Sequence, residues 1–229
     1  MIIYGRVAGV NGERLNVREG RGVDVQAPQP IVLEGYGIQL EPLAPSHLPA
    51  LVSAAGDGEV WRTWYVSVAD LEPGREQAWL DLALRGQAEG HMHVWVVRDR
   101  ASDTIIGSTR FHDIVVPIGR VDIGFTFYAS RWQGTHVNTA CKRLLLAHAF
   151  ESLGAQAVGF RVDNLNARSQ RAVTAIGAKL DGILRHWQAR RDGSVRDQYM
   201  YSIVAAEWPD VRARLDARLA ARLAGGRPT

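Results

Sequence analysis

The sequence predicts a mixed α/β domain of the α+β class, in which a central, mostly antiparallel sheet of about seven strands is flanked by helices. Three strand-like runs that are separated only by turn-forming residues predict an antiparallel meander over residues 93–98, 104–112 and 120–128. A helical pattern and a further strand-like run, 157–162, follow the third of these runs. Such a strand–helix–strand unit places its two strands parallel, so we expect one parallel pair in the sheet.

The elements before the meander are a strand over 38–43, a helix over 46–55 with Ser46 as its N-cap, and a second helix over about 75–87. Three features follow the parallel unit. Asn166 caps a short helix that ends at Gly177, a hairpin joins 182–190 to 195–204 around Asp192-Gly193, and an amphipathic helix covers 207–223.

Residues 1–30 form an N-terminal extension that contains a predicted hairpin around Asn11-Gly12. It could serve as an added edge ribbon, an arm of a homodimer or a partly disordered leader, and the residue pattern leaves these three roles open. The main domain is expected over 36–208, followed by a helical tail over 209–229.

Composition predicts a soluble globular protein, since 46% of the 229 residues are hydrophobic and 22% are charged. No apolar run approaches the roughly 20 residues that a membrane span needs, and the first residues lack the layout of a signal peptide. We therefore expect a cytoplasmic protein without a membrane partner. Cys141 has no second cysteine to pair with and no zinc-site spacing around it, so neither a disulfide nor a metal site is expected.

The basic sequence pI of about 9.3 arises from arginine, because the only lysines are Lys142 and Lys179. Arginine enrichment with scarce lysine is explained as well by genome base composition as by phosphate binding. The arginines are scattered rather than interleaved with stacking aromatics, so we expect no nucleic-acid partner.

Residues 123–138 form the most informative segment of the chain. A buried strand runs into a Gln-Gly-Thr turn that opens a long helix, which we expect to be capped by Asn138 or Thr139 and to end at Leu153. A helix start offers backbone N–H groups without intrahelical partners together with the positive end of the helix dipole. This arrangement predicts a binding site for a diphosphate.

The order of elements and four short motifs resemble the GNAT superfamily of acetyl-CoA-dependent N-acetyltransferases over about residues 36–208. The motifs are Asp122-Ile123-Gly124-Phe125, the segment 132–139 (WQGTHVNT), Asn166-Ala167-Arg168-Ser169, and the ending 177–185 with its Arg191-Asp192-Gly193 hairpin and Tyr201-Ser202 strand. Within the superfamily they are most similar to the Rim branch of ribosomal-protein N-terminal acetyltransferases. The resemblance implies a GNAT-like sheet in which strands 120–128 and 157–162 are parallel and splayed.

The resemblance also implies the binding residues for acetyl-CoA. The backbone of Phe127, Tyr128 and Ala129 pairs with the pantetheine arm, and Asn166 clamps that arm while Ser169 lies near the sulfur. The pyrophosphate loop consists of Gln133, Gly134, Thr135, His136, Val137, Asn138 and Thr139. His136 and Asn138 stand where the family pattern has small residues, so His136 must adopt a negative φ or bear strain.

The implied reaction is direct attack of a primary amine on the thioester, in a ternary complex. Asp122 is the first choice for the general base, His112 is the second, and an ordered water chain is a further alternative. Ser169 is the candidate that protonates the departing thiolate. The competing hypothesis is a non-catalytic acyl-CoA-binding or sensor protein of the same fold. The acceptor, a small molecule or a peptide, is not determined by the sequence.

Overall fold

The computed structural model describes residues 28–62 and 71–225, and most of the predicted N-terminal extension lies outside these ranges. Eight strands form one sheet in the order β1-β2-β3-β4-β5-β6-β8-β7. The strands are β1 (Leu33–Gly35), β2 (Ile38–Pro42), β3 (Met92–Asp99), β4 (Thr104–Val115), β5 (Arg120–Tyr128), β6 (Ala157–Asp163), β7 (Lys179–Ala189) and β8 (Val195–Val204). The predicted α+β class and the antiparallel meander are confirmed, and the strand that was missed is the three-residue β1.

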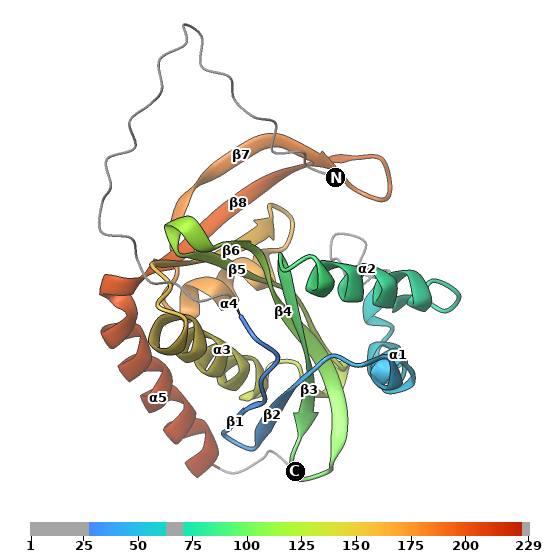
Figure 1. Ribbon diagram of the computed structural model, residues 1–229, viewed down its shortest axis with the longest axis horizontal. Helices are drawn as coiled ribbons and strands as arrows, with labels where there is room; N and C mark the ends of the chain where they lie inside the picture. The colour runs from blue at the N-terminus through green and yellow to red at the C-terminus, as the bar shows by residue number, and fades with distance from the viewer. Residues whose placement is uncertain (1–27, 63–70, 226–229) are drawn as a thin grey trace, which may run out of the picture.

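Helices cover both faces of this sheet (Figure 1). They are α1 (Leu48–Gly56), α2 (Glu76–Ala88), α3 (Val137–Ala147), α4 (Ala167–Ala175) and α5 (Trp208–Ala224). One apolar core packs α3 and α5 against the sheet through residues such as Leu145, Leu146 and Leu215. A second core packs α1 and α2 against the opposite face through Leu51, Trp79 and Val94. Within the described residues, no helix is long and apolar enough to span a membrane.

The start of two helices differs from the sequence-based prediction. A 3₁₀ turn, Pro45–His47, precedes α1, so Ser46 lies before the helix rather than at its N-cap. Helix α3 begins at Val137 with His136 at the N-cap position, which places Asn138 and Thr139 inside the helix. Cap preferences favour Ser and Asn at such positions, but here the chain entering from the sheet decides where the helix begins.

The parallel pair separates after a short contact. Residues Arg120, Val121 and Asp122 of β5 pair with Ala157, Val158 and Gly159 of β6, and no further pairs join these strands. Both strands nevertheless continue, β5 as far as Tyr128 and β6 as far as Asp163. The sheet is therefore open between the C-terminal halves of β5 and β6, as the family resemblance implied.

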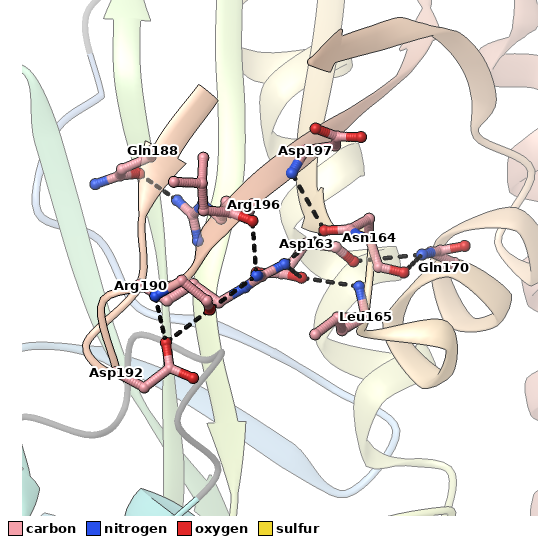
Figure 2. Close-up of polar contacts among 11 residues, drawn as sticks. Asp163, Asn164, Leu165, Gln170, Gln188, Arg190, Asp192, Arg196 and Asp197 are labelled. Carbon is pink, nitrogen blue, oxygen red and sulfur yellow. Dashed lines mark hydrogen bonds and ion pairs between the residues drawn. The ribbon is translucent and has the colours of Figure 1, made fainter. Parts of the chain in front are cut away.

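The β7–β8 hairpin is fastened to the end of β6 by Arg190 (Figure 2). Its guanidinium donates to both carboxylate oxygens of Asp163 at 2.8 and 3.0 Å, and to Oδ1 of Asn164 at 2.6 Å. It also donates to Oγ of Ser194 and the carbonyl of Val195. Because Asp163 and Asn164 lie at the end of β6, in the turn that leads to α4, this contact fixes the hairpin relative to one side of the opening.

Candidate active site

The opening between β5 and β6 lies next to the N-terminus of α3. Within the described residues, several backbone N–H groups at this helix start donate no hydrogen bond to the protein, namely those of Gly134, Thr135, His136, Asn138 and Thr139. Gly134 has φ 78°, and a Cβ built on it would meet no atom within 4 Å, so the space in front of the turn is open. This set of donors fits a diphosphate.

The turn that forms this cradle is held by side chains from distant parts of the chain. Gln133 donates from Nε2 to the carbonyl of Tyr128 at 2.9 Å and accepts from Arg168 of α4 at 2.5 Å. Arg222 of α5 donates to the carbonyl of Gly134 at 2.9 Å. Neither arginine was predicted as a site residue. Arg168 lies within a quoted motif, whereas nothing in the sequence near Arg222 indicates a contact across 88 residues.

His136 adopts φ −69°, so it bears no left-handed strain. Its Nε2 lies 3.1 Å from the carbonyl of Tyr36, which can only accept, so this nitrogen carries a proton. The side chain of Asn138 also faces inward and accepts from the hydroxyl of Tyr128 at 3.3 Å, while Val137 and Thr139 are buried. Residues 136–139 therefore offer backbone rather than side-chain donors to a ligand.

The backbone of Phe127, Tyr128 and Ala129 was predicted to hydrogen-bond the pantetheine arm, and these residues are not equally free to do so. Phe127 and Tyr128 lie in β5 beyond its last pair with β6. The N–H of Ala129 already donates to the carbonyl of Ile106 at 2.8 Å, and its carbonyl accepts from Trp132. Ala129 therefore has no free N–H to offer to a ligand strand.

On the far side of the opening, Asn166 is the N-cap of α4, and its Oδ1 accepts from the backbone N–H of Ser169 at 3.0 Å. The predicted cap is confirmed. The hydroxyl of Ser169 is partly buried and, among the described residues, has no hydrogen-bond partner. It is thus available to a ligand in the opening.

Two β-bulges shape the sheet beside the opening. In β5, Phe125 has φ 50°, and one extra residue lies between the pairs Ser108–Phe127 and Arg110–Gly124. In β4, Asp113 has φ 47° at a second irregularity. Bulges re-aim side chains and are common beside active sites.

The second bulge brings His112 and Asp113 together. The Nδ1 of His112 lies 2.6 Å from Oδ2 of Asp113, and this hydrogen bond is the main reason that the pKa of Asp113 is lowered. Because an ionised carboxylate only accepts, Nδ1 of a neutral His112 carries the proton and Nε2 is left as the acceptor. A Cβ built on Gly124 would lie 2.3 Å from this Nε2, which shows that the imidazole lies directly over β5.

Asp122, the first-choice base, has different surroundings. Its side chain is 1% exposed and forms ion pairs with Arg161 at 2.9 Å and Arg120 at 3.3 Å. Arg161 also pairs with Asp113 at 2.8 Å. The carboxylate of Asp122 is thus committed to two ion pairs with neighbouring arginines.

His112, Asp113 and Asp122 place ligand-type atoms within 4.8 Å of one another. The space between these carboxylates is spanned by the guanidinium of Arg161, which already supplies the positive charge that a metal ion would bring. This cluster is therefore accounted for as an ion-pair network.

The opposite face of the sheet carries a buried cation, Lys142 of α3. Its Nζ donates to Thr126 at 2.8 Å and lies 3.5 Å from the hydroxyl of Thr109. Burial lowers the pKa of Lys142 to about 8. Cys141 beside it is buried in the core, and burial raises the pKa of its thiol to about 11.

Comparison with known proteins agrees with this geometry. The family described as acetyltransferase (GNAT) domain matches residues 38–179, which is more than half of the chain. The uncharacterized N-acetyltransferase p20 of Bacillus licheniformis is 26% identical over 128 residues, 56% of this chain and 68% of p20.

Two solved structures show the same architecture. A GCN5-related N-acetyltransferase from Brucella melitensis is 25% identical with a TM-score of 0.79, and the match covers 87% of this chain and 90% of that one. Mycobacterium smegmatis RimJ, in complex with CoA-disulfide, shares the fold at 20% identity and a TM-score of 0.70, covering 84% and 96% of the two chains. The free N–H groups of the cradle and the opening between β5 and β6 fit the diphosphate and the pantetheine arm of coenzyme A. The chain belongs to the GNAT acetyltransferase domain family and is an acetyl-CoA-dependent N-acetyltransferase.

Proposed function

We propose that the enzyme acetylates a primary amine by direct attack in a ternary complex, with His112 as the general base. The observation that carries this assignment is the His112–Asp113 hydrogen bond, which leaves Nε2 as an acceptor over Gly124. Gly124 lies just beyond the last β5–β6 pair, where the opening begins.

In this mechanism, acetyl-CoA supplies the reactive thioester when it is bound. Nε2 of His112 accepts the proton that the amine must lose, and ionised Asp113 orients the ring and stabilises the imidazolium that results. The N–H groups of Gly134, Thr135, His136, Asn138 and Thr139 hold the diphosphate, and the hydroxyl of Ser169 donates its proton to the departing thiolate. Asp122 ranks below His112, because its carboxylate is engaged by two arginines.

Thiol release from acetyl-CoA over a panel of primary amines tests the activity, with mass spectrometry of the acetylated product. We expect His112→Gln to lower kcat by about 10²-fold or more. The defect should shrink at high pH and with amines of low pKa, since these are already neutral and need less help from a base. A kcat and a pH profile equal to those of the wild type would return the role to Asp122 or to water.

Tight binding of coenzyme A without turnover of any amine would instead support the non-catalytic sensor of the alternative hypothesis. That the acceptor is a small molecule or a peptide, and that the protein forms a homodimer, stay predictions. Size-exclusion chromatography with light scattering measures the assembly directly, and a monomer at micromolar concentration would exclude the homodimer.

A further inference from the structure

Among the described residues, the buried guanidinium of Arg110 in β4 has no carboxylate partner. Arg110 is 1% exposed, and its Nη1 donates to the sulfur of Met92 at 3.0 Å. Nε and Nη2 are also buried, and neither has a hydrogen-bond partner within residues 28–62 and 71–225. The guanidinium lies between two aromatic rings, 4.3 Å from the centroid of Phe125 and 5.0 Å from that of Trp79.

This environment is costly for the folded protein. A buried charge that is not paired destabilises a fold, and cation–π contacts offset only part of that cost. Burial lowers the pKa of Arg110 to about 9, so the group is still cationic at neutral pH. A contribution to stability therefore does not explain why this position is an arginine. An anionic ligand that binds to Nε and Nη2 would explain it.

The position of Arg110 connects it with the reaction. Arg110 pairs directly with Gly124 of β5, and His112 is two residues further along the same strand, so both side chains face α2. Two residues of a strand span roughly 6.6 Å. An anion on Arg110 and an amine at Nε2 of His112 would thus lie within the length of one small molecule.

Among the described residues, the charges beside Arg110 leave its positive charge uncompensated. Asp113 and Asp122 are matched by Arg161 and Arg120. Within the described residues, no carboxylate lies within ion-pair distance of Arg110. The complement of this site is one negative charge.

We propose that Arg110 binds the carboxylate of the acceptor, and that the enzyme acetylates small amines that also carry a carboxylate, such as free amino acids. A guanidinium offers two parallel donors that match a planar carboxylate, and the rings of Phe125 and Trp79 pack against this guanidinium. Phe125 is the partly exposed ring of the two, so its side chain is the one that a ligand must displace. Polycationic acceptors such as polyamines and aminoglycosides are disfavoured by the same charge.

This inference rests on the proposed function. Matched pairs of acceptors test the recognition of a carboxylate separately from the acetyl transfer itself. Each pair consists of a small amino acid and a matching amine that lacks the carboxylate. One pair is an α-amino acid and its carboxamide, and the other is a short ω-amino acid and the alkylamine of equal length. We expect kcat/KM to favour the carboxylate by about 10- to 100-fold, chiefly through KM of the acceptor. Turnover that favours the uncharged partner or an aminoalkyl phosphonate would overturn the carboxylate assignment while leaving the acetyltransferase intact.

Variants of Arg110 separate recognition from structure. Arg110→Met should abolish the preference within each pair, and Arg110→Lys should restore part of it. Because Met removes an unpaired buried charge, the thermal midpoint of Arg110→Met should equal or exceed that of the wild type. An equal loss of kcat/KM for both members of a pair, or a lowered midpoint, would show that Arg110 acts on the fold or on all acceptors alike.

Binding measured without turnover gives an independent result. Isothermal titration of the complex with coenzyme A, using an N-acetyl amino acid and its carboxamide as probes, should show tighter binding of the acid. Arg110→Met should remove that difference. Equal affinities in the wild type would contradict the proposal even if the enzyme acetylates amines.

Discussion

His112 and Asp113 are adjacent in β4, yet Nδ1 of the first lies 2.6 Å from Oδ2 of the second. In a regular strand, consecutive side chains point to opposite faces of the sheet. The left-handed backbone of Asp113, φ 47°, turns its carboxylate to the same side as the imidazole. A local departure from strand geometry thus creates the pair to which we assign proton transfer.

Gly124 should not tolerate a methyl group, because the imidazole of His112 already occupies the space beside it. A Cβ there would lie 2.3 Å from Nε2 of His112, so Gly124→Ala must displace the imidazole. We expect kcat/KM to fall by about 10- to 100-fold, since misplacing a catalytic group by about 1 Å has effects of this size. Gly182→Ala is the matched control, because a Cβ there meets nothing within 4 Å. Wild-type kinetics in Gly124→Ala would refute the placement of the base.

Gly134→Leu tests the cradle. The side chain would fill the open space before the N–H groups, and KM for acetyl-CoA should rise at least about 10-fold. Gly193 has a similar backbone, φ 84° against 78°, and also has open space around it. Gly193→Leu therefore bears similar strain, on the order of 1 kcal/mol, outside the cradle. If both variants changed KM equally, strain rather than occlusion would be responsible.

Variants of Ser169 and Asn166 should distinguish a role in catalysis from a role in capping α4. Ser169→Ala removes the hydroxyl that we assign to the departing thiolate, so kcat should fall. It keeps the backbone N–H that donates to Asn166, so the thermal midpoint and the affinity for coenzyme A should hardly change. Asn166→Ala removes the cap and should cost about 1 kcal/mol of stability. These effects are read from steady-state kinetics and from denaturant unfolding. A stability loss in Ser169→Ala with unchanged kcat would assign Ser169 to the helix alone.

Lys142 should give stability a distinctive pH dependence. Its pKa is lowered to about 8 in the fold from 10.5, so between these values the unfolded chain binds the extra proton and stability rises with pH. The slope from this group is at most about 1.4 kcal/mol per pH unit. Lys142→Met should lose that contribution and be more stable at pH 7, while Thr109 and Thr126 remain hydrogen-bonded to each other at 2.8 Å. Identical pH profiles of unfolding for the two proteins would contradict this.

Arg190→Met should lower the thermal midpoint, because Asp163 and Asn164 would lose the donors that bind the hairpin to β6. Arg185→Met, at an exposed position of β7, the strand that Arg190 follows, is the control and should unfold like the wild type. Differential scanning calorimetry of the two variants makes the comparison. Equal midpoints would mean that the hairpin is held by its strand pairing with β6 alone.

Much of this protein is determined locally and can therefore be predicted from its sequence. Strand β5 was predicted over its full extent, the Asn166 cap depends on contacts three residues apart, and the strand–helix–strand order requires the parallel pair. Hydrophobic periodicity, turn residues and caps act over a few residues, so their pattern is visible in the chain. The family and its cofactor follow from these elements in order.

The chemistry of the site was decided by the tertiary structure. Arg120 lies two residues before Asp122 in the sequence, but only folding places Arg161 beside Asp122, and Arg222 reaches the cradle from 88 residues away. Arg110 looks like any strand arginine until the sheet and α2 enclose it, with no carboxylate partner among the described residues. Charge pairing, burial and the bulges at Phe125 and Asp113 arise from strands and helices that meet only in three dimensions. Sequence spacing does not encode those contacts, and they are the observations on which we base the proposed general base and the proposed carboxylate site.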